Sequence, residues 1–327
     1  MKSSFLALLV LVLVLSCEKD SPEPSNLANR IVIPNGTKDT VLFAKSIDDK
    51  VIPIFFSFPE HATYPLPGTV VLHGSGGNWK DEDTDNDGIA DKINEWQLST
   101  QNQQWNDIFH RELIISAFPD SYSSRGTIEN EGPWKNPPLQ FKISATFIRN
   151  YDAYLTLDLL RKMVWSDGTE MVKPNKVALL GFSHGATAVQ STLFDTQAAN
   201  DNRVWSQNYN GVQYTDEIKA PAPLPVAGGF VAGVMYYPGS FHNSYYGNPC
   251  SGTSIYRTYA DFMIHLPSDD GLTDNSLCML ETVQNNNGGN PVIHHYEGTD
   301  HGFDGNNSTA SNVARQRTLT FLKSKLQ

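Results

Sequence analysis

Short apolar runs alternate with longer amphipathic stretches along most of this 327-residue chain. Two runs, 41–44 and 51–58, flank a polar turn at 48–50 and predict an opening antiparallel hairpin. Six further runs are almost continuously apolar, as strands buried on both faces of a parallel sheet are. They lie at 69–73, 113–118, 176–182, 230–237, 262–266 and 292–296.

Helical patterns separate these runs. Residues 145–164 and 312–326 repeat apolar side chains about every four positions, which is the spacing of one helix face. Alternating strands and helices predict an α/β fold with a largely parallel central sheet flanked by helices. Two polar, turn-rich stretches, 78–107 and 196–226, break the alternation, and we expect both to be insertions beside the active-site mouth.

The N-terminus has the pattern of an export signal. The apolar run 5–15 follows Lys2 and is shorter than the roughly 20 residues that span a bilayer, but it fits a secretory signal peptide. Its end, Leu15-Ser16-Cys17, resembles the lipobox of bacterial lipoproteins, in which the cysteine is lipidated. The alternative is an ordinary signal peptide with an incidental cysteine.

Three parts follow from this pattern. We expect a signal peptide at 1–16, a polar, proline-rich tether at 17–29 and a single domain at 30–327. Lipid on Cys17 would anchor the protein to a membrane of the bacterial cell envelope, with the membrane face left open.

Composition narrows the class of protein. Apolar residues make up 39% and charged residues 18%, as in ordinary globular proteins. The formal net charge is −11 and no segment is rich in lysine or arginine, which argues against a nucleic-acid partner.

A candidate nucleophile lies at a predicted strand-to-helix turn. Residues 181–185 read Gly-Phe-Ser-His-Gly, directly after an apolar strand and before a plausible helix at 186–190. A G-x-S-x-G turn in this context projects the serine hydroxyl from the edge of a sheet. We therefore expect Ser183 to be a nucleophile. His184 either lines the pocket or faces solvent at the start of the helix.

Its partners are expected at later strand ends, in the chain order serine, acid, histidine. His301 follows the last strand and is the expected general base, and Asp269 is the expected acid, with Asp270 and Asp274 as rivals. The glycine-rich loop 73–77 also follows a strand, so we expect the backbone N–H groups of Ser75 and His184 to form an oxyanion hole.

These pieces together resemble the dienelactone hydrolase family, in particular its secreted members with a serine nucleophile. The matching segments run in order over about 40–325, at 73–77, 120–126, 149–153, 181–185, 236–239, 269–270 with Cys278, and 296–304. The resemblance implies one α/β-hydrolase domain. The founding members use cysteine as the nucleophile, whereas this chain has Ser183.

Two cysteines remain if Cys17 carries lipid. An even pair in an oxidising compartment favours a disulfide between Cys250 and Cys278, and two buried thiols are the alternative. Relatives of this kind can join a cysteine after the Tyr-Pro motif to one after the acid strand, which supports the pairing.

An acidic loop resembles the first half of a calcium loop. Carboxylates alternate over 83–91 with a glycine at the sixth place, but the twelfth place holds Asn94 instead of glutamate. We expect either a solvated acidic loop or structural Ca²⁺, whose ligands would be Asp83, Asp85, Asp87, the Ile89 carbonyl and Asp91.

The expected function is that of a serine esterase acting on a small-molecule or polymer-linked carboxylic ester, without a cofactor for catalysis. Two alternatives stay open. One is another acyl hydrolase of the same fold, such as a peptidase or polyester depolymerase. The other is a surface lipoprotein that binds a ligand without catalysis.

Overall fold

A computed structural model describes residues 30–82, 92–125, 145, 148–199, 207–209, 212–214, 222–239, 246 and 254–327. Residues 31–327 form one compact unit. Its main sheet contains β2 (Asp39–Lys45), β3 (Val51–Ser57), β4 (Leu66–Leu72), β7 (Ile115–Pro119), β9 (Val172–Phe182), β12 (Ala232–Tyr236), β13 (Asp261–Pro267) and β14 (Pro291–Tyr296).

The strand order is β14-β13-β12-β9-β4-β7-β3-β2. From β14 to β7 all neighbours pair in parallel, whereas β3 pairs antiparallel with both β7 and β2. The chain moves from β4 to one side and returns to its other side at β9. Ligand sites of open α/β sheets lie beyond the carboxyl ends of strands at such a switch point.

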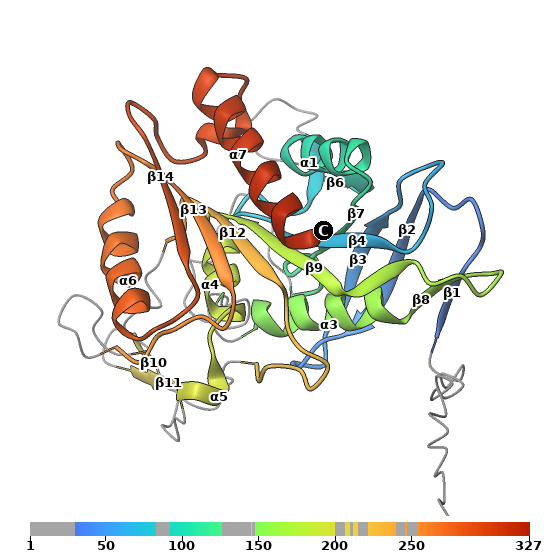
Figure 1. Cartoon of the computed structure of the whole chain (residues 1–327), viewed down its shortest axis with the longest axis horizontal. Coiled ribbons are helices and arrows are strands. Elements are labelled where there is room, and N and C mark those ends of the chain that lie inside the picture. The colour runs from blue at the N-terminus through green and yellow to red at the C-terminus, as the bar shows by residue number, and fades with distance from the viewer. Residues whose placement is uncertain are drawn as a thin grey trace, which may run out of the picture. The chain divides into compact units, whose positions relative to one another are not determined.

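Helices cover both faces of this sheet (Figure 1). On one face, buried side chains of α3 (Arg149–Lys162), α4 (His184–Thr192) and α6 (Thr273–Asn285) share a core with the strands. On the other face, α1 (Thr100–Arg111) and α7 (Thr309–Leu326) close a second core. The fold class predicted from the sequence is thereby confirmed.

Shorter elements complete the described chain. Two are one-turn helices with three residues each, η2 (Ser123–Arg125) and η6 (Phe303–Gly305), and α5 (Thr196–Ala199) is similarly short. Small two-stranded sheets pair β1 (Ile31–Ile33) with β8 (Met163–Trp165), β5 (Trp79–Glu82) with β6 (Lys92–Leu98), and β10 (Gln207–Tyr209) with β11 (Val212–Tyr214).

The prediction of a polar, turn-rich stretch at 78–107 is wrong in one respect, because most of the helix α1 lies within it. The side of α1 that packs on the sheet consists of Asn102, Trp105, Asn106 and Phe109. Two of these four positions are polar, so no apolar periodicity marks the helix. The asparagines are instead hydrogen-bonded inside the core, since Asn102 donates to Asn78 and Asn106 accepts from Ser116.

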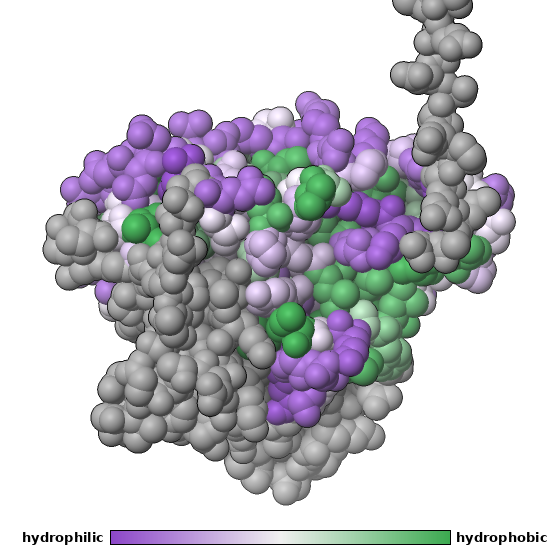
Figure 2. All heavy atoms as spheres, turned by 90° about the horizontal axis from the view of Figure 1, so that it is seen from below, coloured by the Kyte–Doolittle hydropathy of each residue, from purple (hydrophilic) through white to green (hydrophobic). Residues whose placement is uncertain are grey.

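The described surface mixes polar and apolar side chains, as Figure 2 shows for one face. Several of the large apolar side chains that stay exposed, Val32, Phe43 and Val51, belong to β1, β2 and β3. No helix among the described residues combines the length and apolarity that crossing a membrane requires.

His265 on β13 is a buried polar residue on the sheet face that α1 and α7 cover. It is fully buried, stacks on Tyr236 at 4.2 Å between ring centroids, and contacts the hydroxyls of Tyr296 and Thr318 at 2.8 Å each. Burial lowers the pKa of His265 well below its ordinary value. The folded protein therefore keeps this imidazole neutral at pH values where the unfolded chain protonates it.

This difference predicts acid destabilisation. The unfolded state binds an extra proton below about pH 6.5, so the stabilisation is complete above that pH and is lost as the pH falls. Between pH 7.5 and 5.5, wild type should lose about 1 kcal/mol more unfolding free energy than His265→Gln. Urea unfolding at both pH values measures this, and equal losses in the two proteins would contradict it.

Candidate active site

Ser183 occupies a strained turn between β9 and α4. Its backbone has φ 50° and ψ −116°, a region that residues with a side chain rarely adopt. The turn is held from both sides, because Ser183 N–H donates to the Tyr236 carbonyl at 2.9 Å and Ser183 carbonyl accepts from Thr187 N–H at 3.0 Å. Ser183 therefore lies at the carboxyl end of β9, at the strand-to-helix turn that the sequence predicts.

The two glycines of this turn allow close backbone approach. A Cβ on Gly185 would lie 2.0 Å from the Leu72 carbonyl oxygen, and one on Gly181 would lie 2.5 Å from the Gly185 carbonyl oxygen. A side chain at 185 would push the turn away from β4, and one at 181 would push the start of α4 away from β9. The G-x-S-x-G spacing therefore follows from packing between the turn and the sheet.

His301, which follows β14, connects Ser183 to a carboxylate. Its Nε2 lies 2.7 Å from Ser183 Oγ, and its Nδ1 lies 2.6 Å from Asp270 Oδ2. An ionised carboxylate only accepts hydrogen bonds, so Nδ1 carries the proton and Nε2 presents a lone pair to the serine. The side chain of His301 is 39% exposed and that of Asp270 is 7% exposed.

The carboxylate beside His301 is that of Asp270, and the expectation for Asp269 is corrected. Asp269 N–H donates to the Thr299 carbonyl at 3.0 Å, and its exposed side chain accepts from Ser268. Asp270, the next residue of the turn after β13, directs its carboxylate to His301. Its second oxygen accepts from Leu272 N–H at 3.0 Å, which fixes the carboxylate. Within the described part of the chain, no hydrogen bond or ion pair joins Asp274 to His301.

A cluster of largely buried side chains packs beside His301. The Tyr237 ring lies 4.6 Å from the imidazole, and its hydroxyl donates to Asp304. Gln101 donates to the same carboxylate at 2.8 Å and to the Tyr237 hydroxyl at 3.2 Å. Burial raises the pKa of Asp304 above its ordinary value. Sequence reasoning assigned no role to Tyr237 or Asp304, although both stand in the matching segments.

The glycine-rich loop 73–77 lies against the serine turn. A Cβ on Gly74 would be 3.3 Å from the Phe182 carbonyl oxygen and 3.7 Å from Ser183 Cβ. His73 is buried, its Nδ1 contacts the Gly74 carbonyl at 2.7 Å, and its Nε2 accepts from Ser121 N–H at 3.3 Å. Burial lowers the pKa of His73 well below its ordinary value, so the neutral ring holds the loop next to Ser183.

His184, the first residue of α4, is only partly buried and is held by two side chains. Its Nδ1 lies 2.9 Å from Arg149 Nη1 and 3.0 Å from the Tyr122 hydroxyl. Arg149 also donates to the His73 carbonyl through Nη2 at 2.7 Å. The solvent-facing alternative for His184 is thereby replaced by a side chain fixed beside the loop.

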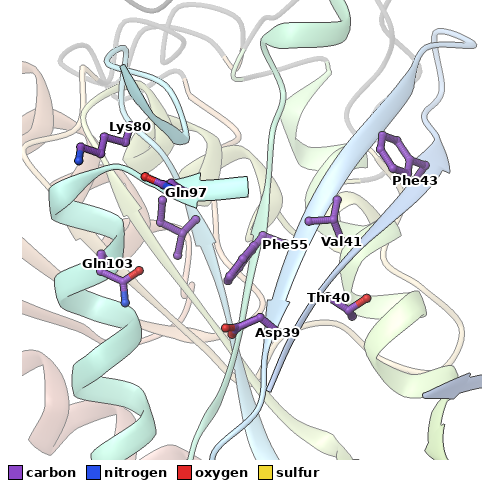
Figure 3. Close-up of a pocket in the computed structure, with 9 residues that line it drawn as sticks. Asp39, Thr40, Val41, Phe43, Phe55, Lys80, Gln97 and Gln103 are labelled. Carbon is purple, nitrogen blue, oxygen red and sulfur yellow. The ribbon is translucent and has the colours of Figure 1, made fainter. Parts of the chain in front are cut away.

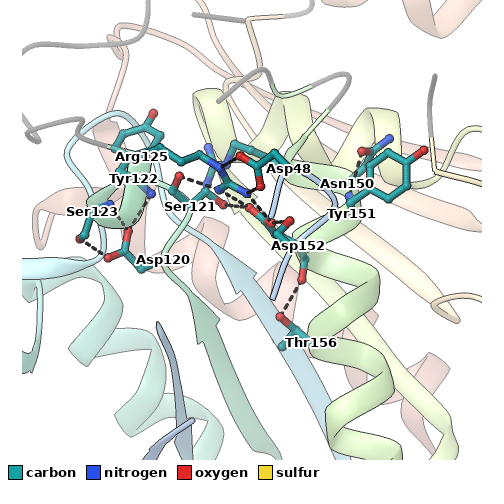
Figure 4. A network of polar contacts seen from close by, with 12 residues as sticks. Asp48, Asp120, Ser121, Tyr122, Ser123, Arg125, Asn150, Tyr151, Asp152 and Thr156 are labelled. Atoms are coloured by element: carbon teal, nitrogen blue, oxygen red, sulfur yellow. Dashed lines mark hydrogen bonds and ion pairs between the residues drawn. The ribbon is translucent and has the colours of Figure 1, made fainter. Parts of the chain in front are cut away.

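A buried ion-pair network holds the segment after β7 against α3 (Figure 4). Arg125 makes a two-pronged contact with Asp152, at 2.8 and 3.0 Å, and a second one with Asp48, at 2.8 and 3.0 Å. Burial alone would raise the pKa of Asp48, but the contacts with Arg125 lower it. Ser121 Oγ also donates to Asp152 at 2.6 Å. The segments 120–125 and 149–153 are therefore coupled in space.

Several predicted residues lie outside the described part of the chain. They are Cys17, Cys250 and the calcium-loop residues Asp83, Asp85, Asp87, Ile89 and Asp91. Lipidation, the Cys250–Cys278 pairing and calcium binding thus stay predictions, although Cys278 on α6 is disulfide-bonded. Within the described ranges, no cluster of three or more histidine, cysteine or carboxylate side chains could hold a metal ion.

A separate hollow lies beside β2 and β3, on the side of the sheet opposite β14 (Figure 3). Its volume is about 680 Å³, and it is lined by Asp39, Thr40, Val41, Phe43, Phe55, Lys80, Gln97, Leu98 and Gln103. None of the three hydrogen-bonded residues of the candidate site lines it. The hydrogen bonds among Ser183, His301 and Asp270 thus place the candidate site at the carboxyl ends of β9, β13 and β14.

Comparisons with solved structures support the fold. The chain is similar to a thermophilic esterase of the planctomycete Thermogutta terrifontis with bound propionate, at 14% identity and a TM-score of 0.52, covering 92% of this chain and 94% of that one. A putative dienelactone hydrolase of Klebsiella pneumoniae matches at 14% identity and a TM-score of 0.51, over 88% and 99%.

A third similar structure is the Thermogutta terrifontis esterase 2 phosphorylated by paraoxon, at 15% identity and a TM-score of 0.52, over 86% of this chain and 91% of that one. No family model and no curated protein matches the sequence. At these identities the likeness shows a common α/β-hydrolase fold.

Proposed function

We propose that this protein is a serine hydrolase that cleaves carboxylic esters through an acyl-enzyme. The observation that carries the proposal is the continuous hydrogen-bonded line from Ser183 Oγ through His301 to Asp270. A hydroxyl, an imidazole in the correct tautomer and an orienting carboxylate are the parts that acyl transfer requires. The esterases among the similar structures are consistent with it.

In the first half-reaction, Ser183 Oγ attacks the ester carbonyl carbon while His301 Nε2 takes the hydroxyl proton. Asp270 stabilises the imidazolium that forms. The tetrahedral intermediate then collapses, the C–O bond to the alcohol breaks, and His301 returns the proton to the leaving alkoxide. In the second half, water attacks the acyl-enzyme with His301 again as base, which releases the acid and restores Ser183.

Negative charge develops on the carbonyl oxygen in both halves. In the proposed mechanism the backbone N–H groups of Ser75 and His184 receive it. Two features support this assignment, namely the contact of loop 73–77 with the serine turn and the position of His184 in the first turn of α4. N–H groups at a helix N-terminus favour anions.

Paraoxon tests the nucleophile directly. Attack of Ser183 Oγ on its phosphorus displaces p-nitrophenolate and leaves a diethylphosphoryl serine. We expect one equivalent of p-nitrophenolate per chain, loss of p-nitrophenyl acetate hydrolysis in parallel, and the added mass on the peptide containing Ser183. A wild-type protein that does not hydrolyse the acetate ester above the buffer rate, or a label on another residue, would overturn the proposal.

A further inference from the structure

Arg149 is a buried cation beside the candidate site that the mechanism above does not use. Its side chain is completely inaccessible to solvent. It begins α3, and its two terminal nitrogens donate in different directions, to the His73 carbonyl at 2.7 Å and to His184 Nδ1 at 2.9 Å. The same guanidinium lies 5.4 Å from the centre of the Tyr122 ring.

Arg149 is buried without a directly bonded carboxylate in the described part of the chain. No carboxylate of the described residues forms an ion pair with it, and its buried Nε has no hydrogen-bond partner. Arg125, five residues after Asp120 in the neighbouring segment, instead contacts both Asp48 and Asp152. Burial lowers the pKa of Arg149, yet an arginine keeps its proton in a protein. Burying a cation without a directly bonded carboxylate is costly, and the coulombic attraction of Asp152 and Asp120 offsets part of that cost.

The two acceptors of Arg149 flank the proposed oxyanion hole. His73 begins loop 73–77, which contains Ser75, and His184 supplies the second proposed N–H group. One guanidinium therefore connects the loop after β4 to the first turn of α4. Because arginine only donates, His184 Nδ1 must accept, which fixes that imidazole as the neutral tautomer protonated at Nε2.

We propose that Arg149 is a positioning residue that holds both halves of the oxyanion hole and whose buried charge favours the oxyanion. This inference rests on the proposed hydrolase function. The carbonyl oxygen gains its negative charge only on the way to the tetrahedral intermediate, so the effect belongs to the transition state. Loss of Arg149 should consequently lower kcat and leave KM for a neutral ester nearly unchanged.

The first experiment compares substitutions of Arg149 with p-nitrophenyl acetate as substrate. Arg149→Met should lower kcat by about 100-fold with KM changed by less than about threefold, and Arg149→Lys, which keeps the charge, should recover about tenfold of that loss. Arg161→Met is the matched control, because Arg161 lies on the same helix and donates to the carbonyls of Pro174 and Gly228. It should keep wild-type kcat.

The second experiment uses His184, whose partial exposure makes its variants more certain to fold. Asparagine places Oδ1 where histidine has Nδ1 and can accept from Arg149, whereas leucine of similar size cannot. His184→Leu should therefore have a kcat about tenfold lower than that of His184→Asn.

Four outcomes separate the two proposals. Equal kcat for His184→Asn and His184→Leu, or folded Arg149→Met with wild-type kcat, would overturn the role of Arg149 while wild type and Ser183→Ala still differ. An equal loss in Arg149→Lys and Arg149→Met would overturn the role of the charge. A wild-type protein without esterase activity and without paraoxon labelling would instead overturn the proposed function.

Discussion

Ser183→Ala should lower kcat for p-nitrophenyl acetate by about 10⁶-fold, because the variant has no atom that can form the acyl-enzyme. His301 would still lie at the edge of the sheet, but it would have no hydroxyl to deprotonate. Initial rates of p-nitrophenolate release, with protein concentration set by absorbance, measure the loss. Alanine keeps the Cβ and hence the same backbone strain, so the variant should be about as stable as wild type in thermal unfolding.

Ser166→Ala is the control for this variant, since Ser166 is an exposed serine that contacts Asn35. Its rate should equal that of wild type. If Ser183→Ala hydrolysed the ester as fast as the control, the proposed nucleophile would be wrong even though its geometry is favourable.

Asp270→Asn should lower kcat by about 10⁴-fold, whereas the neighbouring Asp269→Asn should stay close to wild type. The asparagine amide can donate to His301 Nδ1 and thereby favour the tautomer with the proton on Nε2, which cannot deprotonate Ser183. Both variants remove one negative charge from adjacent positions, so long-range electrostatics is matched between them.

The pair of variants is measured with the same acetate ester at saturating concentration. A large loss in Asp269→Asn together with an active Asp270→Asn would reverse the assignment drawn from the structure. It would restore the one expected from the sequence.

Much of the arrangement was predictable because parallel strands bring their carboxyl ends together. The strand before Ser183 and the strand before His301 were both recognisable as apolar runs, and their order along the chain suits an α/β-hydrolase. Burial of both sheet faces imposes this apolar pattern. The apolar pattern of the strands is therefore sufficient to predict the fold and the approximate position of the site.

The exact acid was not predictable from the same pattern. Adjacent carboxylates at 269 and 270 have the same chemistry, and which of them faces His301 depends on the hydrogen bond between Asp269 N–H and Thr299. That contact joins two loops and leaves no trace in local periodicity. The helix α1 was missed for a related reason, since its buried asparagines are satisfied by distant partners.

The role inferred for Arg149 also depends on contacts that sequence spacing does not reveal. Its two acceptors are 76 and 35 positions away along the chain. An arginine at the start of a helix would ordinarily be taken for a solvated surface residue. Only the folded arrangement shows that it lies inside, between two loops.

The 118 positions between Ser183 and His301 have a consequence for synthesis on the ribosome. Domains are made from the N-terminus, and β14, the strand that leads to His301, occupies one outer edge of the main sheet. A nascent chain can complete the serine turn and the strands around it long before the histidine has been translated. During that interval Ser183 is an ordinary alcohol, and reactivity arises only when the final strand joins β13.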